Sequence, residues 1–163
     1  MSVFRAVLAA CCLTAISTVS QAQQAAPATG DFQKQTVFGV WSKNIFADAV
    51  VVTGPAKTIY LAGMGAEDAD TGVILHQGNF LEQCRYSYDK IRKILAAQGA
   101  TIADIVKITT YVTDMRYGPD YAKCFAEAMT GVVLPAHTLV NITQLAWPGM
   151  MIEVDATAVV AAR

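Results

Sequence analysis

The spacing of apolar residues changes repeatedly along this chain, and this change restricts the fold more than any other feature. Some stretches alternate with the two-residue period of a strand, and others repeat at the three- and four-residue spacing of a helix. Asn79 is placed to cap a helix that Gly99 ends, and Pro119 is placed in the first turn of a second helix. The expected elements are strands at 47–52 and 58–62, a helix at 79–99, a strand at 105–113, a helix at 119–129, and strands at 136–145 and 150–160.

This order, ββαβαββ, predicts an α+β domain in which two helices cover one face of a mixed sheet. Residues 53–57, TGPAK, join the first two strands, and the Gly-Pro pair marks a turn, so we expect a hairpin. The 163 residues are enough for a single domain, expected at 36–163 after a flexible polar tail at 23–35. The sheet face without helices must be covered, and an oligomer is the simplest cover.

Residues 1–22 are typical of a secretory signal peptide. They contain a positive start at Arg5, an apolar stretch over 6–19, and small residues before an expected cleavage after Ala22. A transmembrane helix is disfavoured because the stretch is shorter than the ~20 residues that span a bilayer. A lipoprotein site at Cys11 stays open as an alternative. We expect the mature protein to be periplasmic or secreted, with no membrane attachment after the leader is removed.

Charge and residue spacing argue against several classes of function. The formal net charge is −1, the pI is about 6.1 and no basic stripe is present, so no nucleic-acid partner is expected and a ribonuclease activity is disfavoured. No cysteine and histidine have zinc spacing and no glycine-rich phosphate loop occurs, so no metal site is expected. Cys84 and Cys124 each fall in a predicted helix, and we expect two buried thiols there in preference to a disulfide.

Two segments resemble a known family. Residues 99–114, GATIADIVKITTYVTD, resemble the helix-end glycine and next strand of the RidA (YjgF) family, and residues 134–159, LPAHTLVNITQLAWPGMMIEVDATAV, are similar to its closing signature. The turn at Gly63 is also similar, so the resemblance begins near Val37. It implies a chorismate-mutase-like fold and a homotrimer with the sheets packed as a central barrel. In the best-known members, the clefts between subunits bind 2-imino or 2-enamino acids as small-molecule ligands and hydrolyse them to 2-keto acids and ammonia, with no cofactor.

The resemblance also assigns site residues. Glu153 matches the family glutamate that positions the attacking water, and Trp41, Gly63 and Leu139 fall where members place ligand contacts. His137 stands where the family has the arginine that holds the substrate carboxylate. A neutral imidazole offers one donor in place of a charged pair, which weakens carboxylate binding by about 10-fold to over 100-fold. The cleft is then expected to suit a neutral or differently charged ligand, with His137 as donor, acceptor or general base.

The sequence is compatible with two functions. One is an exported hydrolase of imine- or enamine-like molecules, which the retained Glu153 favours. The other is a non-catalytic small-ligand binder or holdase chaperone, which the missing arginine and the leader favour. Structural interpretations also stand: His137 as a cleft-wall residue, Glu153 as a polar interface residue, and Trp41 as core or cleft lining. The hydrolase requires residues 137 and 153 to meet in a water-accessible pocket between neighbouring copies.

Overall fold

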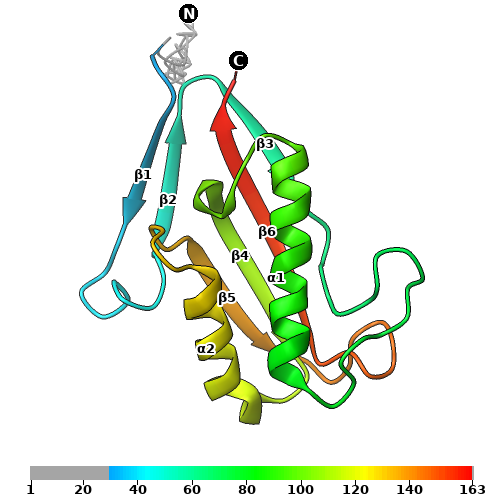
Figure 1. Cartoon of the computed structure of the whole chain (residues 1–163). Helices are drawn as coiled ribbons and strands as arrows, with labels where there is room; N and C mark the ends of the chain where they lie inside the picture. The colour runs from blue at the N-terminus through cyan, green and yellow to red at the C-terminus, as the bar shows by residue number, and fades with distance from the viewer. Residues whose placement is uncertain (1–29, 163) are drawn as a thin grey trace, which may run out of the picture.

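In the computed structural model, which describes residues 30–162, the apolar patterns become strands and helices (Figure 1). The elements are β1 (Gln33–Val37), β2 (Ala49–Thr53), β3 (Ala56–Tyr60), α1 (Phe80–Ala97), β4 (Ile105–Val112), α2 (Gly118–Ala128), β5 (Ala136–Asn141) and β6 (Ile152–Ala161). Short 3-10 turns precede β4 (η1, Ile102–Asp104) and α2 (η2, Met115–Tyr117). The predicted leader at 1–22 lies outside the described residues.

Four strands form the main sheet in the order β3-β6-β4-β5. β4 and β5 are parallel, whereas β6 runs antiparallel to both of its neighbours. Both helices lie on one face of this sheet, and no helix of the described chain covers the other face (Figure 1). The predicted α+β class, with two helices on one face of a mixed sheet, is therefore confirmed.

The predicted hairpin between the first two expected strands is wrong. β2 pairs with β1 in a separate two-stranded sheet, and β3 pairs with β6. The pairing of β3 with β6 places Ile59 in the helix-covered core, and this burial favours it. β1 begins at Gln33, inside the tail predicted to be flexible, so the order of elements gains a strand at its start. At the corner between β2 and β3, Gly54 has a φ of +81°, a conformation that favours glycine.

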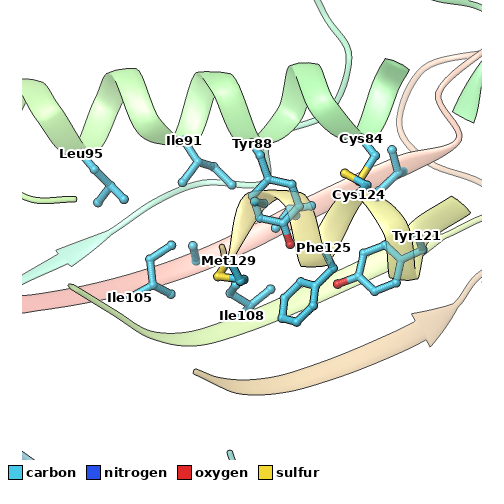
Figure 2. Packing of buried hydrophobic residues seen from close by; sticks show 14 of the residues in the cluster. Cys84, Tyr88, Ile91, Leu95, Ile105, Ile108, Tyr121, Cys124, Phe125 and Met129 are labelled. Carbon is cyan, nitrogen blue, oxygen red and sulfur yellow. A yellow bond between two sulfur atoms is a disulfide. The ribbon is translucent and has the colours of Figure 1, made fainter. Parts of the chain in front are cut away.

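The hydrophobic core lies between the helices and the main sheet (Figure 2). The apolar stripe predicted for the first helix, α1, is buried against the main sheet. Side chains of α2, and Met129 directly after it, pack in the same layer. The main members are Cys84, Tyr88, Ile91, Leu95, Tyr121, Cys124, Phe125 and Met129, packed on Ile108, Val112, Ile152 and Val154. Each fully buried aliphatic side chain stabilises the fold by roughly 1.5–3 kcal/mol. This packing holds α2, which also forms one wall of a pocket, in place against the main sheet.

The predicted ends of the first helix are confirmed. The Asn79 side chain accepts a hydrogen bond from the backbone N–H of Glu82 at 3.2 Å, as an N-cap does. Beyond the last turn, Gly99 has a φ of +71°, the left-handed conformation in which helices commonly stop.

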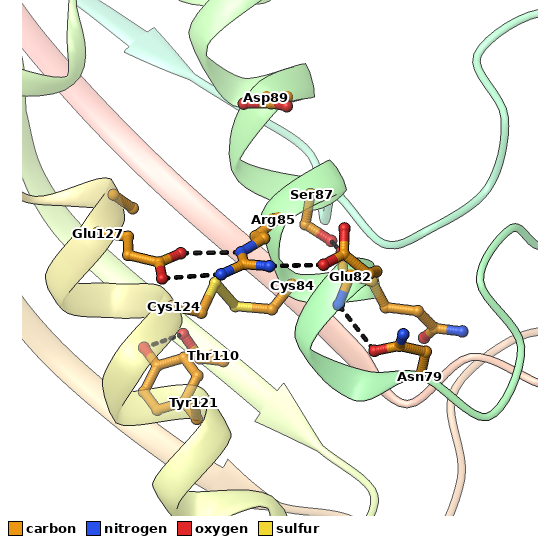
Figure 3. The surroundings of a disulfide bond; sticks show 12 residues. Asn79, Glu82, Cys84, Arg85, Ser87, Asp89, Thr110, Tyr121, Cys124 and Glu127 are labelled. Carbon is orange, nitrogen blue, oxygen red and sulfur yellow. Dashed lines mark hydrogen bonds and ion pairs between the residues drawn. A yellow bond between two sulfur atoms is a disulfide. The ribbon is translucent and has the colours of Figure 1, made fainter.

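Cys84 and Cys124 form a disulfide between α1 and α2, with their Cα atoms 6.3 Å apart (Figure 3). The expectation of two free thiols is therefore wrong. Each cysteine is buried on the side of its helix that meets the other helix, so helix packing brings the pair within bridging range. Neither helix pattern alone could show this, because the residues are 40 positions apart.

A buried amide connects α1 to two loops. The Nε2 of Gln83 donates to the carbonyl oxygens of Leu75 at 3.2 Å and Gly149 at 2.8 Å. Its Oε1 accepts a hydrogen bond from the backbone N–H of Met151 at 2.8 Å. Gln83 is fully buried, and so is its bond to Met151, so removing the amide would leave that N–H without a partner. The residue therefore holds the loops before α1 and before β6 in place.

Candidate functional site

An open pocket of about 620 Å³ lies between α2 and β5, and we call it the α2–β5 pocket. Its walls come from α2 and the residues around it, from β5, and from the loop that precedes β2. The lining residues are Asn44, Ile45, Phe46, Met115, Gly118, Tyr121, Ala122, Phe125, Ala126, Met129, Leu134, His137 and Leu139. Most of these side chains are apolar, which is typical of small-molecule sites.

His137 is the polar centre of this pocket. Its Nε2 lies 2.9 Å from the Tyr121 hydroxyl and 3.3 Å from Oγ1 of Thr110. The two hydroxyls also contact each other at 3.0 Å (Figure 3). The imidazole stacks on Phe125, with ring centroids 5.0 Å apart and an angle of 16° between the planes. One ring nitrogen is thus held by two hydroxyls, and the ring plane is fixed by an aromatic neighbour.

The surroundings of His137 keep its ring neutral. Burial lowers the pKa of His137 to about 4, and the positive charge of Lys107 adds to the effect. Burial also raises the pKa of Tyr121 to about 12, so its hydroxyl stays protonated. At neutral pH the pocket therefore presents an uncharged imidazole and a phenol. Such a site can donate or accept a hydrogen bond, but it supplies no positive charge for a carboxylate.

The other two predicted ligand contacts near this pocket differ in their placement. Leu139 lines the pocket on the same face of β5 as His137, as the alternation predicts. Trp41 is 76% exposed and lies outside the pocket lining. Its ring packs edge-on against Phe46, at 5.7 Å between centroids, and Phe46 does line the pocket. Within one chain, Trp41 therefore contacts a residue that lines the pocket but does not line the pocket itself.

Thr110 and Tyr121 were not among the predicted site residues. The sequence could have indicated Thr110, because the alternation of β4 places it on the same buried face as Ile108 and Val112. A hydroxyl on that face needs a hydrogen-bond partner. Tyr121 carries a hydroxyl on the stripe of α2 that faces the sheet, which is the second half of the same signal. Their meeting at His137 depends on the pairing of β4 with β5, which places Ile108 opposite His137.

Glu153 and Gly63 come together at a different place. A Cβ built on Gly63 would lie 2.1 Å from Oε1 of Glu153, so only glycine permits this contact. Glu153 lies opposite Tyr111 in the pairing of β6 with β4, and the hydroxyl of Tyr111 donates to Oδ2 of Asp155 at 3.3 Å. Burial raises the pKa of Glu153, and the negative charges of Asp155 and Glu67 raise it further. A carboxylate with a raised pKa is a stronger general base.

His137 and Glu153 lie on opposite faces of the main sheet. The ring of His137 packs on Phe125 of α2, on the helix-covered face. On β6, Ile152 and Val154 belong to the core under the helices, so Glu153 between them points to the face without helices. One chain therefore does not bring the two predicted catalytic residues into one pocket. They can share a site only if they come from two chains.

The described residues contain neither a metal-binding cluster nor a membrane-spanning helix. Between residues 30 and 162, no three His, Cys, Asp or Glu side chains gather closely enough to hold a metal ion. None of the helices in that part of the chain has the length and apolar character needed to cross a bilayer.

Comparisons with known proteins agree with the fold. A family model described as Endoribonuclease L-PSP matches residues 42–160. A RutC family protein of Pyrococcus horikoshii is 31% identical over 104 residues, which is 61% of this chain and 77% of that protein. The Rid-family protein YyfB of Yersinia pestis superposes with a TM-score of 0.67 at 26% identity, covering 77% of this chain and 97% of that one. A Mycobacterium tuberculosis member of the YjgF/YER057c/UK114 family has a TM-score of 0.54 at 27% identity, covering 78% and 100%.

These matches confirm the family resemblance drawn from residues 99–114 and 134–159. The family model alone spans most of the chain, and the solved structures share its arrangement of helices and sheet. The protein therefore belongs to the Endoribonuclease L-PSP family, which includes the RidA and YjgF proteins.

Proposed function

We propose that this protein is exported, forms a homotrimer, and hydrolyses an imine- or enamine-like small molecule in clefts between its subunits. The observation that carries the proposal is the placement of Glu153, whose carboxylate packs on Gly63 and whose pKa is raised by burial and by neighbouring acids. A general base of this kind is what hydrolysis of a C=N bond needs. The α2–β5 pocket supplies the space for the organic part of the molecule.

In the proposed reaction, Glu153 accepts a proton from water while the water oxygen bonds to the carbon of the C=N group. The proton then passes to the nitrogen and gives a carbinolamine. Glu153 next accepts the hydroxyl proton and passes it to the same nitrogen, so the C–N bond breaks and ammonia leaves as the C=O bond forms. The balance is one imine and one water giving one carbonyl compound and one ammonia. Glu153 ends in its starting state, so it acts as a base and then as an acid.

A second chain is part of the proposal because one chain holds only half of the site. The face of the main sheet that carries Glu153 has no helical cover, and β5 is an edge strand of that sheet. An adjacent copy whose β5 edge meets this face would bring its own pocket toward the carboxylate. Packing of three such faces as a central barrel would form three clefts. Each cleft would then combine the α2–β5 pocket of one chain with Glu153 and Gly63 of the next.

A second candidate is a non-catalytic binder of small molecules, or a holdase for unfolding proteins. The neutral His137 favours it, because the family's cationic anchor for a substrate carboxylate is absent. Both candidates use the same pocket, and they differ in whether Glu153 performs chemistry.

The discriminating experiment measures ammonia release from an imine generated in situ, with wild type, Glu153→Gln and His137→Arg. The hydrolase proposal expects wild type to exceed the spontaneous rate and Glu153→Gln to lose about 100-fold or more of the excess. Wild-type and Glu153→Gln rates that both equal the spontaneous rate, with activity gained in His137→Arg, would establish the binder. Equal activity in wild type and Glu153→Gln would remove the assignment of Glu153.

Co-expression of two inactive variants tests whether each site is shared. Glu153→Gln keeps the pocket, whereas Ala126→Trp fills the pocket and keeps the carboxylate. If each site takes its halves from two chains, random assembly restores about a quarter of the wild-type activity. No recovery in co-purified mixed oligomers would show that both halves act within one chain. The intact mass of the exported protein tests cleavage after Ala22.

A further inference from the structure

The α2–β5 pocket has no charged side chain in its lining. Its thirteen lining residues include only three with polar side chains, Asn44, Tyr121 and His137. Two cationic residues, Arg116 and Lys123, are close in sequence to residues that line the pocket, but both interact with acidic side chains outside it. Arg116 forms an ion pair with Asp114, and Lys123 acts on Glu127, whose pKa it helps to lower.

The one cation that influences His137 is also engaged on the opposite face of the sheet. The Nζ of Lys107 donates to Oγ1 of Thr138 at 2.5 Å. Thr138 alternates with His137 and Leu139 along β5, so this contact lies away from the pocket. An anion in the pocket would thus give up its hydration without gaining a counter-charge. The cost of burying such a charge is far larger than that of burying a neutral polar group.

Apart from the exposed amide of Asn44, the polar groups of the pocket leave one position for a ligand, and it is on His137. The Nε2 of His137 is occupied by the hydroxyls of Tyr121 and Thr110, which also contact each other. Within residues 30–162, Nδ1 of His137 has no hydrogen-bond partner. Hydroxyls can donate or accept, so the neutral ring can place its proton on either nitrogen. Nδ1 can therefore donate to a carbonyl or imine nitrogen, or accept from an N–H.

We propose that the α2–β5 pocket selects an uncharged, mainly apolar molecule of metabolite size whose single hydrogen-bonding group, a carbonyl or imine, meets Nδ1 of His137. This inference rests on the proposed function for the location of the site, and it specifies the ligand class. It excludes free 2-imino acids, whose carboxylate would enter an apolar pocket without a cation. The bound molecule stacks its apolar part along the small residues of α2 and against Leu139.

The test uses two probes of nearly equal shape, 2-naphthylacetamide and 2-naphthylacetate, whose binding to the purified protein is measured by calorimetry at pH 7. The amide is expected to bind at least about tenfold more tightly than the carboxylate. His137→Arg should reverse this order, since a guanidinium grips a carboxylate with two charged hydrogen bonds. Tighter or equal binding of the acetate by wild type would overturn the proposal, as would the absence of amide binding.

Matched variants locate the binding. Ala126→Trp fills the pocket from an exposed position on α2 and should abolish amide binding, whereas Ala96→Trp on the exposed side of α1 should not. The chain has only two histidines, so ring ¹⁵N spectra report His137 with the exposed His76 as reference. The amide should shift the His137 nitrogens alone, and a shift confined to His76 would overturn the proposal. Unchanged amide binding by Ala126→Trp would also overturn it.

These probes contain no C=N bond, so binding is read without turnover. Preference for the amide together with no imine hydrolysis would remove the hydrolase and leave the ligand class standing. Hydrolysis of imines together with preference for the acetate would do the reverse.

Discussion

Acidification tests most directly whether His137 stays neutral in the folded protein. In the folded protein the pKa of His137 is lowered to about 4 by burial, with Lys107 adding a like charge. The groups that touch the ring are the hydroxyls of Thr110 and Tyr121 and the face of Phe125, and none of these carries a charge near neutral pH. In the unfolded chain the ring returns to its ordinary pKa of 6.5.

The difference between these two pKa values sets the sign and the size of the change in stability with pH. Above pH 6.5 the ring is neutral in both states, and its protonation has no effect on stability. As the pH falls from 6.5 to 4, the unfolded chain binds a proton that the folded protein refuses, so stability falls. Between pH 7 and pH 4 the loss from this residue is about 3 kcal/mol, since each pKa unit corresponds to ~1.4 kcal/mol. This loss is a large part of the ~5–15 kcal/mol that holds a typical domain together.

The assay is urea unfolding at several pH values, with His137→Phe as the control. The Phe variant keeps the stacking on Phe125 and leaves the hydroxyls of Thr110 and Tyr121 paired with each other. Carboxylates titrate in both proteins, so the difference between their pH profiles isolates the imidazole. Wild type should lose about 3 kcal/mol more than the variant between pH 7 and pH 4. Parallel profiles, or an imidazole titration midpoint near 6.5 by NMR, would show that burial does not keep the His137 ring neutral.

Three more predictions concern single contacts. The double variant Cys84→Ser/Cys124→Ser should lower the free energy of unfolding by about 4 kcal/mol, because a loop of this length is released in the unfolded chain; an unchanged urea midpoint would count against the bond. Gln83→Leu leaves the buried N–H of Met151 unpaired and removes the hydrogen bonds to two carbonyl groups, so thermal unfolding should show a loss of about 2 kcal/mol. Gly63→Ala should displace the Glu153 carboxylate and reduce any imine hydrolysis by about tenfold or more with little change in melting temperature, and full activity would show that the contact has no catalytic role.

The local parts of the fold could be predicted because their signals are local. Asn79 caps the first helix and Gly99 ends it, as their side chains and backbone preferences indicate. The strand β4 follows from simple alternation. β1 could not be predicted in this way, because four of its five residues are exposed and show no alternation. Its pairing with β2, and the pairing of β3 with β6, are not encoded by any pattern within the single strands.

In the candidate site too, the features set within one strand could be predicted, whereas the contacts between distant segments could not. Alternation correctly places His137 and Leu139 on one face of β5 and sets Glu153 apart from its apolar neighbours on β6. The relation between the two strands depends on their separate pairings with β4, which no pattern within either strand encodes. The disulfide and the contact of Tyr121 with His137 likewise depend on how α2 packs.

One face of the sheet carries the Glu153 carboxylate and the other carries the neutral His137. This difference in charge links the proposed hydrolysis to the proposed uncharged ligand. A neighbouring chain that brings Glu153 to the α2–β5 pocket places this carboxylate beside a neutral His137, where an arginine would have supplied a positive charge. A substrate carboxylate in the same cleft would then add a second anion at close range, and like charges in a poorly hydrated site oppose each other strongly. An uncharged substrate avoids this repulsion. It also leaves the pKa of Glu153 raised by burial, as a general base for water requires. The replacement of the family arginine by His137 is thus compatible with hydrolysis when the substrate carries no charge of its own.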